Sequence, residues 1–329
     1  MKTLQLGTDG PLVSAQGFGA MGISVAYGDT DLTEARATLE RAFELGITLF
    51  DTADAYGFGE NERFLAPFFA AHRDELVIAT KFGLHRSEDG ELTIHNDPAY
   101  LRAAADASLR RLGVDQIDLY YMHRRNPEVP IEEMVGAMAE LVAAGKVKHL
   151  GLSEVTGAEL ATAHAIHPIA AVESEWSLFS RDIERQVVPT AVRLGIAMVP
   201  YSPLGRGLLT GVNHVDPNAA NDARNTMPRF QGTNGEANQA LLEPVRKIAE
   251  AHKATVAQVA LAWVQQRAAV WGTTVVPIPG TRSRTRVEEN VGALDLTLDD
   301  AELAVLEPIA DQVAGARWHD PSFISSGRE

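Results

Sequence analysis

The stretch "GITLFDTADAYG" (residues 46–57) begins as a short apolar run and ends in a polar segment that carries an aspartate and a tyrosine. A weaker run, "SAQGFGAM" (14–21), precedes it. Continuous apolar runs, rather than alternating ones, are typical of parallel strands that are buried on both faces. Six further runs of this kind follow: "LVIATK" (76–81), "IDLYYMH" (117–123), "VKHLGLS" (147–153), "IAAVES" (169–174), "IAMVPY" (196–201) and "VVPIPG" (275–280).

Helical patterns separate these runs, with apolar residues at a period near 3.6 and a glycine at the end of each. The clearest are "DLTEARATLERAFELG" (31–46), "DPAYLRAAADASLRRLG" (97–113), "PIEEMVGAMAELVAAG" (130–145) and "DIERQVVPTAVRLG" (182–195). Eight strands that alternate with helices predict a closed (β/α)₈ TIM barrel. We therefore expect a single barrel domain over residues 1–329, preceded by a β-hairpin that turns at Asp9 and Gly10.

The alternative architecture is an open, doubly wound sheet. That fold would need a glycine-rich dinucleotide fingerprint that opens a helix after the first strand. The chain offers only "GFGAMG" (17–22), which does not open a helix. The pattern therefore favours the barrel.

One connection is much longer than the others. Residues 204–239, which follow the seventh predicted strand, are rich in Gly, Asn, Pro and Asp. A loop of this length in a compact fold is usually a lid or a binding loop. A disordered insertion is the other interpretation.

Composition excludes several classes of function. The chain has 329 residues, of which 45% are apolar and 22% charged, and its net charge of −15 argues against a nucleic-acid-binding surface. It contains no cysteine, which excludes disulfides, thiolate catalysis and cysteine-based zinc sites. The first residues lack the apolar region of a secretory signal, and no apolar stretch approaches the roughly 18 residues of a membrane span. We expect a cytoplasmic protein with no membrane or nucleic-acid partner.

Three consecutive predicted strands end in ionisable residues: Asp51, Lys81 and His123. The active sites of (β/α)₈ barrels lie at the carboxyl ends of the strands. Neighbouring parallel strands are about 4.8 Å apart, so these side chains are expected to form one row, with Tyr56 above them. Each residue alone has a structural explanation, such as a cap, a solvated charge or a packing histidine. Together they favour a catalytic group.

This group suits proton transfer to an oxygen. A free tyrosine has a pKa near 10, and a lysine ammonium beside Tyr56 is expected to lower that pKa. Asp51 would keep Lys81 charged and oriented, and His123 would orient a carbonyl oxygen or relay the proton. No serine lies next to a histidine base, so acyl transfer is not indicated. The pattern predicts a positioned acid that serves a carbonyl receiving a hydride.

The loops after the seventh and eighth strands are where barrels commonly bind phosphate. Tyr201 ends the seventh strand, where its ring can stack on a flat heterocycle, and Arg206 follows among the backbone N–H groups of Gly205 and Gly207. In the other loop, three arginines crowd the start of a helix, whose dipole and free N–H groups attract anions: Arg282, Arg284 and Arg286. A solvated basic turn is the alternative interpretation.

Over nearly its whole length the chain resembles the aldo-keto reductases, and in particular their bacterial and plant branch. The resemblance rests on "YSPLGRGLLTG" (201–211), "PRF" (228–230), "IPGTR" (278–282) and "EEN" (288–290). It implies a (β/α)₈ barrel, NADPH as cofactor without a metal, and hydride transfer to an aldehyde or ketone. The family's catalytic tetrad matches Asp51 and Tyr56 in "FDTADAYG", Lys81 in "ATKFG" and His123 in "YYMHR", with Tyr56 as general acid.

The resemblance also implies the residues that contact the cofactor. The positions that bind the nicotinamide carboxamide fall on Ser153, Glu154 and Glu173, where the commonest family pattern has Asn and Gln at the last two. A carboxylate can accept a hydrogen bond from the carboxamide NH₂ but cannot donate one to its oxygen. The full expected set is Gly19, Met21, Ser153, Glu154, Glu173, Tyr201, Ser202, Pro203, Leu204, Gly205, Arg206, Gly207, Ile278, Gly280, Thr281, Arg282, Arg286, Glu289 and Asn290.

The substrate is expected to be a small carbonyl compound. Candidates for its pocket are Tyr27, Phe82 and Arg124, with Trp176 and Trp318 as further aromatics. A different class of function is a nucleotide-sensing regulatory subunit, since barrels of this superfamily also serve potassium channels as β subunits. The intact tetrad favours the enzyme, and the sequence leaves the oligomeric state open.

Overall fold

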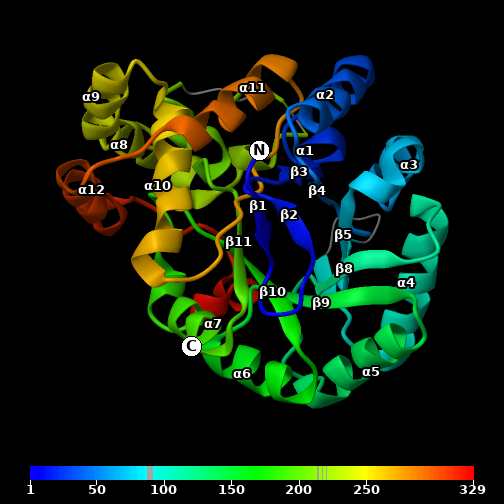
Figure 1. Cartoon of the computed structure of the whole chain (residues 1–329). Coiled ribbons are helices and arrows are strands. Elements are labelled where there is room, and N and C mark those ends of the chain that lie inside the picture. Colours follow the sequence, from blue (N-terminus) through cyan, green and yellow to red (C-terminus); the bar gives the residue numbers. More distant parts are fainter. Residues whose placement is uncertain (87–91, 213–214, 217, 220) are drawn as a thin grey trace.

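Figure 1 shows the computed structural model of the chain, which describes residues 1–86, 92–212, 215–216, 218–219 and 221–329. Seven strands form one parallel sheet in the order β11-β10-β9-β8-β5-β4-β3. They are β3 (Phe18–Gly19), β4 (Leu49–Asp51), β5 (Val77–Phe82), β8 (Ile117–Met122), β9 (Val147–Ser153), β10 (Ile169–Glu175) and β11 (Ala197–Tyr201). The first seven predicted runs are therefore confirmed as strands, although β3 is much shorter than expected, β5 continues one residue past Lys81, and β8 ends one residue before His123.

The eighth predicted strand, residues 275–280, is not a regular strand, and this prediction was wrong in its detail. The segment still joins the two edges of the sheet. The N–H groups of Val276 and Ile278 donate to β11 (2.9 and 3.0 Å), and the carbonyls of Pro277 and Pro279 accept from the β3 side (2.9 and 3.5 Å). Since proline has no N–H group, a continuous hydrogen-bond ladder cannot form here. The barrel is closed nevertheless, as the sequence predicted.

Helices cover the outside of the sheet, as Figure 1 shows. The four helices predicted most clearly are confirmed as α2 (Leu32–Glu44), α4 (Pro98–Leu112), α5 (Ile131–Ala143) and α7 (Val187–Leu194). Their ends follow local chemistry: the Asp31 carboxylate caps α2 by accepting from two backbone N–H groups, and Gly113 ends α4 in the left-handed conformation. The helices around the barrel are α2 (Leu32–Glu44), α3 (Glu60–His72), α4 (Pro98–Leu112), α5 (Ile131–Ala143), α6 (Gly157–Ile166), α7 (Val187–Leu194), α10 (Val256–Trp271) and α11 (Arg284–Gly292).

Several smaller elements lie outside the ring of barrel strands and helices. The predicted hairpin is confirmed, with β1 (Thr3–Gln5) antiparallel to β2 (Leu12–Ser14). Leu6 and Val13 from the hairpin pack into the apolar cluster inside the barrel, together with Leu49 and Ala79, so the hairpin closes one end. The other elements are α1 (Met21–Ser24), β6 (Leu84–Arg86), β7 (Leu92–Ile94), α8 (Asn234–Ala240), α9 (Glu243–His252) and α12 (Asp300–Leu306).

The long connection between β11 and α9 is folded over its described residues. It contains short helical turns at 205–210, 223–225 and 228–230, followed by α8, whereas residues 213–214, 217 and 220 lie outside the described part. The connection reaches the loop that follows α1: Ala223 N donates to Ala26 O (3.0 Å), and Gly28 N donates to Asn221 O (3.3 Å). The described part of this segment therefore has the position that a lid would need, and its closure over a ligand stays a prediction.

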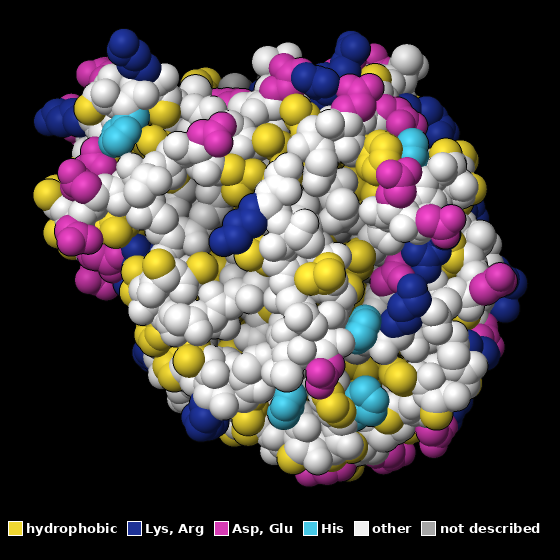
Figure 2. Space-filling view, in the orientation of Figure 1, with side chains coloured by type: hydrophobic (Ala, Val, Ile, Leu, Met, Phe, Trp, Pro, Cys, Tyr) yellow, Lys and Arg dark blue, Asp and Glu magenta, His cyan; other side chains and the backbone are white. Residues whose placement is uncertain are grey.

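The surface carries both signs of charge. On the face drawn in Figure 2, acidic and basic side chains are interspersed, and no continuous basic patch is seen there. Within the described ranges, no helix is long and apolar enough to cross a membrane. The same residues include no group of three His, Asp or Glu side chains placed to hold a metal ion.

Candidate active site

The structure brings the four predicted catalytic side chains together at the carboxyl ends of the strands. Asp51 ends β4, Lys81 lies on β5, His123 follows β8, and Tyr56 comes from the loop between β4 and α3. The Lys81 ammonium is wholly buried and donates to the Asp51 carboxylate and to the Thr52 carbonyl (3.0 Å). The Tyr56 ring centroid lies 5.3 Å from Lys81 Nζ and 5.7 Å from the His123 ring, which it meets edge-on at 83°. The row inferred from the strand ends therefore exists.

The pKa of Tyr56 differs from the sequence expectation. Burial raises this pKa to about 12, and the charges of Asp51 and Glu173 act in the same direction. Lys81 lowers the pKa, as expected, but does not outweigh burial. The expectation of a net lowering is therefore wrong in this structure, because the sequence did not show how deeply the phenol is enclosed. At neutral pH the phenol keeps its proton, which suits an acid.

His123 is held neutral. Burial, together with the nearby positive charges of Arg124 and Lys81, lowers the pKa of the imidazole well below its ordinary value. Its Nδ1 atom is buried and has no hydrogen-bond partner among the described residues. A neutral imidazole can hydrogen-bond a substrate oxygen without competing for the proton of Tyr56.

Glu173 on β10 borders the tetrad, and sequence reasoning missed its contact with Lys81. Its side chain is buried, and Oε1 lies 3.4 Å from Lys81 Nζ. A signal was available: Ala171, two residues earlier on the same strand, packs inside the barrel, so the period-2 alternation turns Glu173 inward as well. The lysine of the tetrad therefore has two carboxyl neighbours, Asp51 and Glu173.

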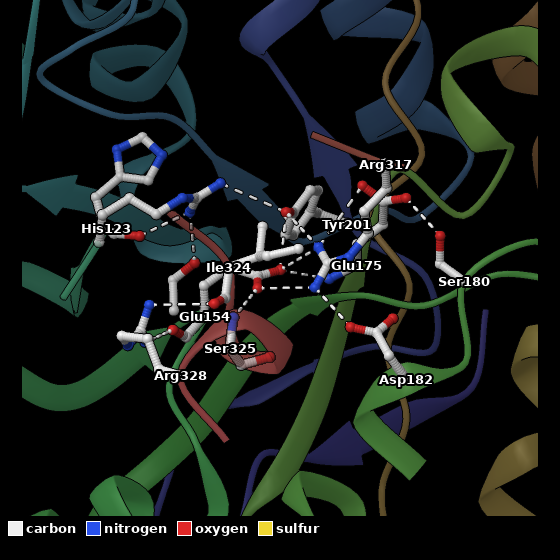
Figure 3. A network of polar contacts seen from close by, with 12 residues as sticks. His123, Glu154, Glu175, Ser180, Asp182, Tyr201, Arg317, Ile324, Ser325 and Arg328 are labelled. Atoms are coloured by element: carbon white, nitrogen blue, oxygen red, sulfur yellow. Dashed lines mark hydrogen bonds and ion pairs between the residues drawn. The ribbon is translucent and has the colours of Figure 1, made fainter. Parts of the chain in front are cut away.

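Glu154, predicted to contact the cofactor, is surrounded by protein donors (Figure 3), and its contact with a cofactor stays a prediction. Arg317 from the C-terminal segment binds its two oxygens at 2.9 and 3.0 Å. The Tyr201 hydroxyl (2.8 Å) and the backbone N–H groups of Glu175 (3.1 Å) and Ser325 (3.0 Å) complete the set. Burial alone would raise the pKa of Glu154, but Arg317 holds it below its ordinary value, so this group is an anion.

The C-terminal segment is thus part of the site. No local sequence pattern predicts this role. Arg317 also binds Asp182 (2.9 Å), and Arg328 binds Glu159 on α6 (3.2 Å). Both arginines are nearly enclosed, with 5% and 10% of their side chains exposed. These contacts hold the segment against the ends of β9 and β10, next to Tyr201, as Figure 3 shows.

Backbone strain gathers at the predicted cofactor positions. Six non-glycine residues of the described chain have a positive φ, and three of them are Glu154 (50°), Ser202 (47°) and Arg206 (56°). Residues with side chains rarely adopt this conformation, and it is often found at binding sites. Arg206 is nearly buried, lies 3.7 Å from Glu175, and its Nε has no hydrogen-bond partner among the described residues.

The three arginines near the start of α11 differ in their surroundings. Arg282 donates to the carbonyls of residues 27–29 (2.7–3.1 Å), which fixes the loop after α1. Arg284 pairs with Glu34 on α2 (2.9 Å). Arg286 is exposed, and no carboxylate in the described part of the chain lies within ion-pair distance of it. Arg286 is thus the member of the set that is left for an external anion.

The remaining predicted residues divide between the barrel mouth and the core. Gly280 approaches β3 so closely that a Cβ there would lie 2.6 Å from the Gly19 carbonyl. Arg124 lies at the mouth, 3.2 Å from Ser153 Oγ and with its guanidinium 5.7 Å from the Tyr201 ring centroid. Among the aromatic candidates, the Tyr27 ring centroid lies 5.1 Å from the Arg224 guanidinium, and the Trp318 ring centroid lies 5.6 Å from that of Arg206, whereas Phe82 stacks on Tyr120 in the core (5.1 Å between ring centroids). Trp176 is wholly buried, and its indole N–H donates to Glu184 (2.9 Å). Of the remaining cofactor candidates, Ile278 and Asn290 are buried, the Thr281 hydroxyl accepts from Ser283 N, and the Glu289 carbonyl accepts from Gln258.

Comparisons with known proteins agree with this geometry. The sequence pattern of the Aldo/keto reductase family matches residues 16–311. A probable aldo-keto reductase 1 from Glycine max is 43% identical over 325 residues, which cover 97% of this chain and 92% of that protein. Among solved structures, a glycerol dehydrogenase from Gluconobacter oxydans superposes with a TM-score of 0.84 at 29% identity, covering 98% of each chain. A thermostable aldo-keto reductase in complex with the inhibitor epalrestat gives a TM-score of 0.73 at 26% identity, covering 94% of this chain and all of that one.

The ends of the barrel strands bring together a buried tyrosine, lysine, aspartate and histidine. This fold and this site define an oxidoreductase of the (β/α)₈ barrel class. With a family match over residues 16–311 and a relative 43% identical over nearly the full length, this chain belongs to the aldo/keto reductase family.

Proposed function

We propose that this protein is an NADPH-dependent carbonyl reductase that converts an aldehyde or ketone to an alcohol, with Tyr56 as general acid. The observation that carries the proposal is the buried cluster of Tyr56, Lys81, Asp51 and His123 at one end of the barrel. No member of this cluster is a nucleophile for acyl transfer, whereas a protonated phenol beside a neutral imidazole suits the protonation of an oxygen.

Each residue of the cluster has a role in the proposed reaction. Tyr56 donates its proton to the substrate oxygen as negative charge develops there, and His123 hydrogen-bonds the same oxygen. Lys81 stabilises the phenolate that forms, since its ammonium favours the charged state of Tyr56. Asp51 keeps Lys81 in place through their ion pair. NADPH, when bound, supplies the hydride.

The residues of this chain fit such a cofactor. The structure leaves donors without protein partners among its described residues: the exposed Arg286 for a phosphate, and the buried Nε of Arg206 in the loop after β11. Tyr201 would stack on the nicotinamide ring. Ser202, Leu204, Arg282, Glu289 and Asn290 are proposed to line the phosphates and adenosine, as the family resemblance implies.

The test is turnover of Tyr56→Phe. We expect NADPH consumption with 4-nitrobenzaldehyde to fall by roughly 10²–10⁴ in kcat, the usual contribution of a positioned acid, while NADPH still binds. Tyr120→Phe is the matched control, because this buried hydroxyl has no hydrogen-bond partner in the described chain and its ring packs in the larger core cluster rather than inside the barrel. Near wild-type turnover of Tyr56→Phe would remove this residue from the mechanism. Oxidation of alcohols with NADP⁺ should be assayed as well, since one structural relative is a glycerol dehydrogenase.

A further inference from the structure

The hydroxyl group of Tyr201 is held by a buried carboxylate. It donates to Glu154 Oε1 at 2.8 Å, and the Glu154 side chain is wholly buried. One guanidinium nitrogen of Arg124 and one of Arg317 each lie 3.4 Å from the same hydroxyl oxygen. Because a hydrogen bond to an ionised carboxylate is stronger than one between neutral groups, the contact with Glu154 fixes the hydroxyl end of the Tyr201 ring.

The backbone end of Tyr201 is fixed by the barrel. Tyr201 is the last residue of β11, where it pairs with Glu175 of β10, and its ring packs against the apolar cluster inside the barrel. The chain turns sharply at the next residue, since Ser202 has a φ of 47°. Because the strand ends here, it holds the ring at the backbone only, and the hydroxyl contact with Glu154 supplies a second point of attachment.

Glu154 in turn is held by the C-terminal segment. Arg317 binds both of its carboxylate oxygens (2.9 and 3.0 Å), Ser325 N donates to Oε2 (3.0 Å), and Arg328 donates to its backbone carbonyl. The backbone of Glu154 has a φ of 50°, which a residue with a side chain rarely adopts. Such a conformation persists only where the surroundings enforce it, and the C-terminal segment provides several of these contacts.

Among these contacts, Arg317 is the one on which the charge of Glu154 depends most. Burial by itself disfavours the anion, but the charge and the hydrogen bonds of Arg317 keep the pKa of Glu154 below its ordinary value. Without this guanidinium, Glu154 is expected to take up a proton or to turn toward another donor. Either change would remove the charged acceptor of the Tyr201 hydroxyl.

We propose that Arg317 is a positioning residue of the active site, which acts through Glu154 to fix the orientation of the Tyr201 ring on which the nicotinamide stacks. This proposal rests on the proposed function, which assigns the stacking to Tyr201. Figure 3 shows the three side chains linked in this order. The C-terminal segment thus acts on the nicotinamide end of the site through Tyr201, although it follows the last helix of the barrel in the sequence.

The test compares the binding of NADPH with that of 2′-phospho-ADP-ribose, which is NADPH without its nicotinamide. Tyr201→Phe keeps the ring and removes the hydroxyl, whereas Arg317→Met removes the charge that holds Glu154. Each variant should bind NADPH about 2- to 12-fold more weakly than the wild type, the range that a stacked pair of aromatic groups contributes. Neither substitution should change the affinity for 2′-phospho-ADP-ribose.

The double variant distinguishes positioning from general support of the fold. If Arg317 acts through the Tyr201 hydroxyl, Arg317→Met should cause no further loss of NADPH affinity once Tyr201→Phe has removed that hydroxyl. If the two residues acted independently, their fold-changes would multiply, and this outcome would overturn the proposal. Arg185→Met is the control for the C-terminal segment, because it removes the contact with Glu329 (3.2 Å) and leaves Glu154 in place. Its NADPH affinity should equal that of the wild type, and a loss as large as that of Arg317→Met would mean that the whole segment, rather than Arg317, is responsible.

Other outcomes separate the role of Arg317 from the proposed function. Unchanged NADPH affinity in Tyr201→Phe would overturn the proposal, even if Arg317→Met proved too unstable to study. An equal loss of affinity for 2′-phospho-ADP-ribose in Arg317→Met would overturn it as well, because Arg317 would then act on the phosphate-binding loop after β11. If the wild type bound neither ligand, the cofactor assignment itself would be refuted.

Discussion

Replacing Arg317 by methionine should destabilise the protein strongly, although this residue lies in the C-terminal segment, after the last strand and helix of the barrel in the sequence. Arg317 makes two charge-assisted hydrogen bonds to Glu154 (2.9 and 3.0 Å), and the two side chains are 5% and 0% exposed. Each such bond contributes about 1.5–3 kcal/mol. Breaking a buried pair by removing one partner costs about 3–5 kcal/mol, since the other charge stays buried. We expect a loss of this size in the free energy of unfolding, measured in urea at pH 7.

Two comparisons sharpen the test. Lys247→Met removes an exposed ion pair with Glu243, whose side chains are 72% and 61% exposed, and should cost less than about 1 kcal/mol. The double substitution Glu154→Gln with Arg317→Met should lose less than Arg317→Met alone, because no charge is left buried. A loss below about 1 kcal/mol for Arg317→Met would refute the reasoning that this pair is buried and tightly formed.

The same pair predicts a pH dependence. Because Arg317 holds the pKa of Glu154 below its ordinary value, the stabilisation by this pair is complete above that value, near 4.3 for a free glutamate. It is lost as the pH falls toward the lowered pKa of the folded state. The difference in the free energy of unfolding between the wild type and Arg317→Met should therefore have its full size at pH 7 and become smaller in acid. A difference that widens below pH 4 would contradict the assignment of Glu154 as an anion.

Other predictions concern the cofactor and barrel closure. Arg286→Ala should weaken NADPH binding by roughly 10- to 150-fold and leave NADH binding nearly unchanged, since it removes a charge-assisted hydrogen bond to the 2′-phosphate. The control, Arg284→Ala, should weaken the binding of neither cofactor. Equal weakening of both cofactors by Arg286→Ala would show that Arg286 only supports the helix. NADPH should protect residues 221–238 from hydrogen exchange if they close over it, and equal exchange rates with and without NADPH would make the segment a passive insertion. Gly280→Ala should lower the free energy of unfolding by about 1–3 kcal/mol, because its Cβ would lie 2.6 Å from the Gly19 carbonyl, and an unchanged urea midpoint would contradict this close contact.

The sequence by itself determined the barrel and the catalytic row. Both follow from local patterns: buried parallel strands are continuous apolar runs, and the residue that ends each run lies at the rim where barrels hold their active sites. Asp51, Lys81 and His123 can therefore be placed together from the order of the residues alone. The eighth strand was the exception, because Pro277 and Pro279 interrupt its hydrogen bonds while the closure of the barrel still holds the segment in place.

Only the tertiary structure decided the surroundings of these residues. Arg317 and Glu154 are 163 positions apart, and their pairing depends on the path of the C-terminal segment, which no local pattern encodes. The contact of Glu173 with Lys81 likewise depends on how the closed barrel turns its inward side chains toward one another. The pKa of Tyr56 rises rather than falls because burial outweighs the charge of Lys81, and burial is a property of the packed molecule. Residue types and spacing thus determine which groups meet at the strand ends, whereas long-range packing determines their charge and their partners.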